Sequence, residues 1–115
     1  MLVRVLGRFK QLYTVAHVLA EVSNLTDLPG AEGSNARRVL RETISLLSEV
    51  GISSARAAED RLYNRLGLVD AAISAVARAH DCVVLTDDFD LYLQLTYDKV
   101  AVLNFAHLRA REWGI

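Results

Sequence analysis

The sequence has one cysteine, one proline and one tryptophan, and aromatic residues make up 7% of the chain. A single cysteine excludes an internal disulfide and any zinc site built from several cysteines. With one proline and six glycines among 115 residues, the chain has little material for an interdomain linker. We therefore expect a single domain over residues 1–115.

The chain also lacks a long apolar run and an excess of charge of either sign. Its apolar runs are a few residues long, whereas a transmembrane helix needs roughly 20, and no signal-peptide core is present. Thirteen basic and fourteen acidic side chains give a formal net charge of -1, so no overall positive field attracts nucleic acid. We expect a cytoplasmic protein without membrane association, and any RNA contact must be local.

Short apolar segments alternate with helical patterns along the chain. Strands are predicted at residues 12–15, 82–85 and 100–103, with a weaker candidate at 52–55. Helices are predicted at residues 18–25, 35–50, 56–66, 70–80, around 91–95 and from 105 onward. The first segment, residues 2–9, fits a helical stripe better than a strand at residues 2–6. Strands that alternate with helices predict an α/β fold with a parallel sheet.

Acidic residues stand where the pattern predicts a buried surface. Glu21 shares a helix face with Val18 and Leu25. Asp70 lies at the inner edge of an apolar stripe, three residues before Ile73, at the start of its helix. Because burial of an unpaired charge costs several kcal/mol, such carboxylates are usually paired, cap a helix or bind metal.

Three more acidic residues follow the predicted strand at residues 82–85, namely Asp87, Asp88 and Asp90. In open α/β sheets the carboxyl ends of strands are where ligand sites collect. If the helices that carry Glu21 and Asp70 flank this strand end, the carboxylates converge in one oxygen-rich pocket. Hard oxygen ligands without cysteine or histidine suit Mg²⁺ or Mn²⁺.

Each of these acids also has a purely structural interpretation. Asp70 fits a helix N-terminal cap, as do Asp87 and Asp88. Glu21 fits a pair with His17 one helical turn away. The spacing leaves these alternatives open beside the metal site.

The order and spacing of the motifs resemble those of PIN-domain ribonucleases. The segments RLGLVDAAI at residues 65–73 and VVLTDDFDL at 83–91, with residues 100–105 after them, resemble the C-terminal half of that family. YTVAHVLAEV at residues 13–22 is similar to the family's second strand and acidic helix. The resemblance extends from about residue 12 to residue 109, and it implies a three-layer α/β/α fold with a short, mostly parallel sheet.

The resemblance implies a nuclease in which acidic residues bind Mg²⁺ or Mn²⁺ and a metal-activated water attacks an RNA phosphodiester. The matching catalytic and metal-binding positions are Glu21, Asp70 and Asp88, with Asp90 as a further metal ligand. Thr86 and Asp87 would orient these ligands through hydrogen bonds. RNA is the implied substrate, and an antitoxin-like protein is a further partner that the resemblance suggests.

One part of the family pattern has no counterpart in this sequence. That pattern begins with a central strand that ends in a metal-binding acid, whereas here no acidic residue precedes Glu21. We therefore expect an N-terminally shortened domain with a gap between the strands at residues 12–15 and 83–85. The sheet closes directly, residues 2–6 substitute as a strand, or another chain completes it. Because unpaired strand edges favour association, we expect a homo-oligomer.

Two other functions stay open. The missing acid favours a noncatalytic PIN-like scaffold, an interaction protein or a truncated inactive form. A phosphatase of the haloacid dehalogenase type would use Asp88 and Asp90, but that motif usually opens a chain and the matching lysine and acid pair is not evident. A basic helix face at Arg37, Arg38 and Arg41 is more typical of solvated surface than of a phosphate contact.

Overall fold

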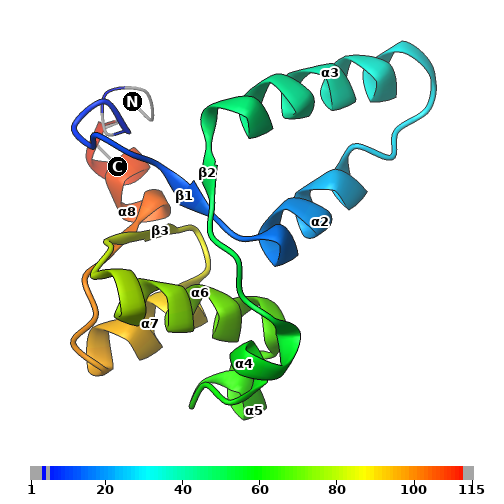
Figure 1. Cartoon of the computed structure of the whole chain (residues 1–115). Helices are drawn as coiled ribbons and strands as arrows, with labels where there is room; N and C mark the ends of the chain where they lie inside the picture. The colour runs from blue at the N-terminus through cyan, green and yellow to red at the C-terminus, as the bar shows by residue number, and fades with distance from the viewer. Residues whose placement is uncertain (1–3, 5, 113–115) are drawn as a thin grey trace.

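The computed structural model of the chain describes residue 4 and residues 6–112, and strands alternate with helices along it (Figure 1). The strands are β1 (Tyr13–Thr14), β2 (Ser48–Glu49), β3 (Val84–Thr86) and β4 (Val102–Asn104). The helices are α2 (Ala16–Leu25), α3 (Gly30–Leu46), α4 (Ser54–Ala58), α5 (Tyr63–Leu66), α6 (Leu68–His80), α7 (Phe89–Tyr97) and α8 (Phe105–Glu112). This mixed architecture confirms the predicted α/β fold class.

The strands form two separate parallel pairs. β1 pairs with β2, with Tyr13 opposite Ser48, and β3 pairs with β4, with Val84 opposite Val102. Within the part of the chain that the structure describes, no ladder joins β1 to β3. The expected outcome in which these two strands pair directly with each other is therefore wrong.

A cavity of about 550 Å³ takes the place of that missing ladder. Its walls include residues 12–15 on the β1 side and residues 82–85 on the β3 side. The gap that the sequence predicts between these two strands is thus present. Arg4 and Leu6 are helical, in line with the preferred prediction for the first segment, whereas residues 2, 3 and 5 lie outside the described residues.

Helix α6 holds the molecule together, because it contributes to both groups of buried apolar side chains. One group packs α6 against α7 and β3, and consists of Leu62, Ala77, Val84, Leu91 and Leu95. The other packs α6 against α4 and the end of β1, and consists of Val15, Ala57, Ala72 and Val76. The small alanines let α4 approach α6 closely, and this close packing fixes the start of α6 beside the end of β1.

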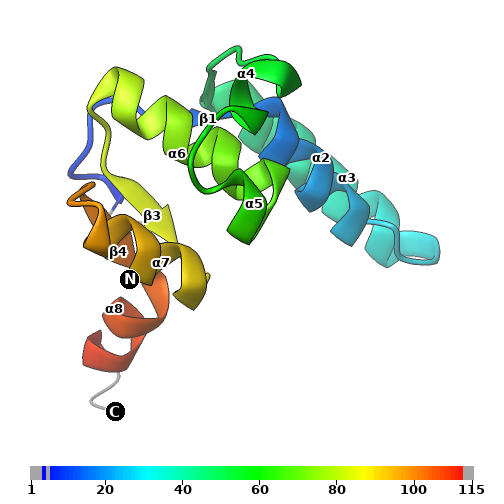
Figure 2. The ribbon, with the colours of Figure 1, turned by 90° about the horizontal axis from the view of Figure 1, so that it is seen from below.

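The α2–α3 hairpin projects from this body as an arm (Figures 1 and 2). Gly33 is the buried residue of α3, and a side chain there would collide with the backbone carbonyl of Leu28. Leu25 and Leu46 are 76% and 80% exposed. The radius of gyration, 15.0 Å, exceeds the value of about 13 Å expected for a compact chain of this length, as a projecting arm requires.

The helix predicted at residues 35–50 is wrong at both ends. α3 begins at Gly30, directly after Pro29, so the predicted loop is one helical turn shorter. Proline at the boundary favours a helix start, and Glu32 in the first turn suits the helix dipole. At the other end, Leu47 is extended and the chain enters β2, whose pairing with β1 offsets the lost helical turn.

Two weaker predictions between residues 52 and 66 are also wrong. The strand expected at 52–55 lies at β2 instead, and Ser53 caps α4 by accepting a hydrogen bond from the Arg56 backbone N–H at 3.1 Å. The helix expected at 56–66 is split into α4 and α5. The Asp60 carboxylate accepts the Leu62 N–H at 2.9 Å and stabilises the turn between them. No helix in the described part of the chain combines the length and apolarity that a membrane span requires.

Candidate functional site

The carboxyl end of β1 leads through buried Val15 into α2, which carries Glu21 in its second turn. Glu21 is exposed, so the expectation of a buried carboxylate is wrong for this residue. The helix face that it shares with Val18 and Leu25 belongs to the projecting arm, and no residue of α2 is buried. The alternative pairing with His17 is also wrong, because His17 Nε2 lies 3.1 Å from the hydroxyl of Ser54.

Asp70 stands in the first turn of α6 and is half-buried. The N-cap of α6 is Gly67, which adopts a positive φ of 90° and offers no side chain to the helix. Asp70 is therefore not the N-cap, although its place in the first turn suits the helix dipole, as the structural interpretation also predicts. Its carboxylate is held at this position by the packing of α6 and not by a capping hydrogen bond.

Asp88 does cap a helix, as its structural interpretation predicts. Its Oδ1 accepts the Leu91 N–H at 3.0 Å, while its own backbone N–H donates to Thr86 Oγ1 at 3.0 Å. Thr86 thereby shapes the turn that presents Asp88 after β3. The second carboxylate oxygen of Asp88 is not part of this cap. Asp87 and Asp90 are exposed beside it, with Asp90 in the first turn of α7.

The electrostatics of Asp70 bring these acids into one neighbourhood. Its pKa is raised from the ordinary 3.8 to about 6. Burial is the largest cause, followed by the negative charges of Asp88, Glu21 and Asp90. Carboxylates from α2 and from the start of α7 therefore lie close enough to Asp70, in the first turn of α6, to act on it.

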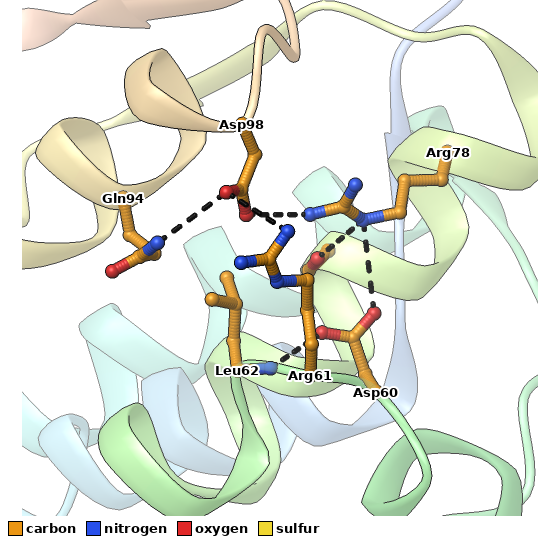
Figure 3. Close-up of polar contacts among 7 residues, drawn as sticks. Asp60, Arg61, Leu62, Arg78, Gln94 and Asp98 are labelled. Carbon is orange, nitrogen blue, oxygen red and sulfur yellow. Dashed lines mark hydrogen bonds and ion pairs between the residues drawn. The ribbon is translucent and has the colours of Figure 1, made fainter.

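A second acidic cluster, formed around Asp98, shows the usual way in which this chain accommodates buried carboxylates (Figure 3). The Asp98 side chain is 1% exposed, and it accepts a hydrogen bond from Arg78 Nη2 at 2.8 Å. Arg61 Nη1 lies 3.2 Å from its other oxygen. Arg78 also lies 3.9 Å from Asp60 and donates to Ser74 Oγ. Sequence reasoning missed this cluster because its members are far apart along the chain.

The two clusters differ in their compensating charge. Asp98 has two guanidinium groups, whereas the ion pairs formed among residues 4 and 6–112 include none with Glu21, Asp70, Asp88 or Asp90. A half-buried carboxylate beside exposed acids of like charge, without a cation, is an arrangement found at ligand sites. The acids at the carboxyl ends of β1 and β3 are therefore the candidate site.

The donor chemistry of this site fits a hard divalent cation, because its side chains offer carboxylate oxygens and no sulfur. A cation would also relieve the repulsion that raises the pKa of Asp70. In the portion of the chain described, however, no three His, Cys, Asp or Glu side chains are arranged to hold a metal ion. The carboxylates share a neighbourhood without meeting at one point.

The basic helix face predicted at Arg37, Arg38 and Arg41 lies on α3, which is part of the arm. Arg37 Nη2 lies 3.8 Å from Asp27, and Arg38 forms an ion pair with Glu42 at 3.1 Å. Two of the three arginines are thus engaged with acids on the same arm. This agrees with their interpretation as solvated surface.

The family model described as PIN domain matches residues 2–94 of the chain. The chain belongs to the PIN-domain family. PIN domains are generally nuclease domains, typically use divalent metals and often bind RNA. The match includes β1, α6, β3 and the acids around Asp70, and it confirms the resemblance found in the sequence. Neither the curated proteins nor the solved structures contain a significant match to this PIN domain.

Proposed function

We propose that this PIN domain is a divalent-metal-dependent ribonuclease that hydrolyses RNA phosphodiesters with Mg²⁺ or Mn²⁺. Glu21, Asp70 and Asp88 would bind the ion as the catalytic acids, and Asp90 would be a further ligand. The ion would lower the pKa of a bound water and stabilise negative charge on the phosphate oxygens. Thr86 would keep the Asp88 turn in place, and Asp87 would shape its outer side.

The observation that carries this proposal is the gathering of Asp88, Glu21 and Asp90 near half-buried Asp70, because none of these four acids is in an ion pair formed among residues 4 and 6–112. Burial and these three charges together raise the pKa of Asp70. A divalent ion favours the charged form of its ligands, so its binding would lower the pKa of Asp70 and offset the repulsion from the neighbouring carboxylates. Because Glu21 is exposed at one side of the site, its side chain is free to turn toward an ion at Asp70.

A noncatalytic PIN-like scaffold is the second candidate function. It is favoured by the absence of a preformed set of three metal-binding side chains among the residues described. The phosphatase alternative is not favoured, because the Asp88 carboxylate is engaged as the cap of α7 and the family match is to PIN domains.

The proposed setting of the activity is cytoplasmic, which the lone cysteine supports. We also propose a homo-oligomer, supported by the apolar residues that the α2–α3 arm exposes, among them Leu25 and Leu46. RNA is the proposed substrate. The proposal of an antitoxin-like protein partner rests on the family resemblance alone.

The test is cleavage of a labelled mixed-sequence RNA by the chain and by Asp70→Asn, each with Mn²⁺, with Mg²⁺ and with EDTA. Asp27→Asn is the matched control, because Asp27 lies on the arm and its side chain is 87% exposed. We expect cleavage by the chain and by the control with metal, and none by Asp70→Asn or with EDTA. If neither the chain nor the control cuts RNA with either metal, the nuclease proposal is wrong for this chain, and a scaffold or a truncated inactive form stays as the alternative.

A further inference from the structure

The first turns of α7 and α8 carry three ring side chains that lie against one another. The rings of Phe89 and Tyr92 are stacked, with their centroids 6.4 Å apart and their planes inclined by 20°. The His107 ring meets Tyr92 edge-on, at a centroid distance of 5.2 Å and an interplanar angle of 82°. Both distances fall in the range of favourable contacts between rings. We call these three side chains the aromatic row.

The aromatic row lies at the same end of the β3–β4 pair as two acids of the candidate site. β3 and β4 are parallel, with Thr86 opposite Asn104, so α7 and α8 both begin at the carboxyl end of this pair. Phe89 stands between Asp88 and Asp90 in the chain. A ligand at these two carboxylates is therefore close to the Phe89 ring.

Helix caps hold the aromatic row in place. The Asp88 carboxylate accepts the Leu91 N–H at 3.0 Å, which fixes the start of α7. Asn104, which is 5% exposed, caps α8, because its Oδ1 accepts the N–H groups of Ala106 at 2.8 Å and of His107 at 3.3 Å. Rings that are already held in position lose little conformational entropy when a ligand binds to them.

Phe89 provides the open surface of the row. Its side chain is 51% exposed, although Leu91 and Leu95 of the same helix are fully buried. Tyr92 is half-buried and contacts one side of the Phe89 ring. The rest of the Phe89 ring is therefore available to stack on a planar ligand.

The charges around Phe89 favour a nucleobase over an apolar protein surface as this ligand. Asp88 and Asp90 adjoin the ring in the chain, and charged side chains are depleted from the buried centres of protein interfaces. The formal net charge of the chain is -1, so an overall positive field does not draw RNA to it. Stacking of a base on an aromatic ring supplies affinity without such a field, and it tolerates any sequence because every base has a π-face.

We propose that Phe89 stacks on an unpaired base of the RNA, beside the phosphodiester at the acids of the candidate site. Tyr92 supports the Phe89 ring, and His107 supports Tyr92. This inference rests on the proposed ribonuclease function and names a residue that binds the substrate by stacking. Because bases in a duplex are stacked on one another, Phe89 would favour single-stranded over double-stranded RNA.

Photocrosslinking tests the contact directly. The probe is a short, fluorescein-labelled, single-stranded oligoadenylate with one central 5-iodouridine, irradiated with the chain in EDTA and again with Mn²⁺. Cleavage by a metal-dependent enzyme is absent in EDTA, so the probe stays intact there. We expect mass spectrometry to place the crosslink on Phe89 or on Tyr92.

Fluorescence anisotropy with the same RNA in EDTA separates stacking from apolar packing. Phe89→Leu keeps an apolar side chain but removes the ring, and should weaken RNA binding roughly tenfold, which corresponds to 1.4 kcal/mol. Phe89→Tyr keeps the ring and should bind RNA like the parent chain. Tyr97→Leu is the matched control, because Tyr97 is an aromatic residue at the other end of α7 and is 78% exposed. Urea unfolding of Phe89→Leu checks that its fold is intact.

Failure of this inference and failure of the ribonuclease proposal give different results. Equal RNA affinity of Phe89→Leu and a parent chain that cleaves RNA would overturn the stacking alone, as would a crosslink confined to other elements. Binding that depends on Phe89 in a chain that cleaves no RNA would overturn the nuclease alone. No RNA binding in EDTA or with Mn²⁺ would overturn both. An altered oligomeric state of Phe89→Leu with unchanged RNA affinity would assign the ring to a protein contact instead.

Discussion

Replacing Asp70 by asparagine separates the stability of this PIN domain from its metal chemistry. Asparagine keeps the shape of the side chain but removes a charge that burial disfavours most and that Asp88, Glu21 and Asp90 also oppose. We expect Asp70→Asn to be more stable than the parent chain at pH 7 without metal, and to bind Mn²⁺ more weakly.

The pKa of Asp70 determines how the stability of the parent chain depends on pH, and hence at which pH Asp70→Asn is the more stable protein. The pKa of Asp70 is about 6 in the folded chain and near 3.8 in the unfolded chain, so the folded chain holds more protons between these values. The free energy of unfolding therefore falls as pH rises from about 4 to about 6, and the loss is complete above that window. The two pKa values set an upper bound of about 3 kcal/mol. Solvent access to this half-buried group lowers the expected gain at pH 7 to about 1–2 kcal/mol.

Urea unfolding of the parent chain and of Asp70→Asn at pH 4 and pH 7, with and without Mn²⁺, measures the free energy of unfolding and its increase on metal binding. The variant should gain stability at pH 7 and little at pH 4, and Mn²⁺ should stabilise the parent chain more than the variant. Asp27→Asn is the control for loss of an exposed acid and should behave like the parent. Equal stability of Asp70→Asn and the parent at pH 7, or equal Mn²⁺ affinity, would refute the reasoning.

Three further substitutions test the fold around the site. Asp98→Asn leaves Arg78 without its closest carboxylate and should cost about 1–3 kcal/mol in urea unfolding, with the loss absent only if the cluster contributes nothing to stability. Gly33→Ala drives a methyl group into the carbonyl of Leu28 and should cost about 1–3 kcal/mol, with faster hydrogen exchange confined to the arm. Ser53→Ala removes the cap of α4 and should cost about 1 kcal/mol in thermal unfolding, whereas an unchanged midpoint would show that the cap is dispensable.

The parallel α/β architecture could be predicted from the sequence because each buried strand is a short apolar run between helical patterns. β3 and β4 lie within two residues of their predicted positions, and β4 leads directly into α8 as expected. β2 could not be predicted, because Ser48 and Glu49 have no strand pattern and pair only because β1 lies beside them. Tertiary contacts decide such short edge strands.

The exposure of Glu21, which was expected to be buried, shows a different limit of sequence reasoning. Helical spacing correctly places Glu21 on one face with Val18 and Leu25, but periodicity states which residues share a face and not what covers it. In the described part of the chain, α2 and α3 project together as an arm, so the face of α2 that carries Leu25 is left exposed. Asp70, by contrast, was predicted at the edge of a buried stripe and is half-buried, because α6 is packed from several sides.

Asp70 and Asp98 are carboxylates removed from solvent to different extents, and they differ in the charges that surround them. The chain surrounds Asp98 with two arginines, which shows that its fold can bring cations to a buried acid where stability requires them. Around Asp70 it places three more acids instead, and burial raises the cost of that arrangement further. A cluster with only a structural role would gain stability from a single arginine or asparagine. The uncompensated charge around Asp70 is therefore the feature on which the proposed divalent-cation site rests.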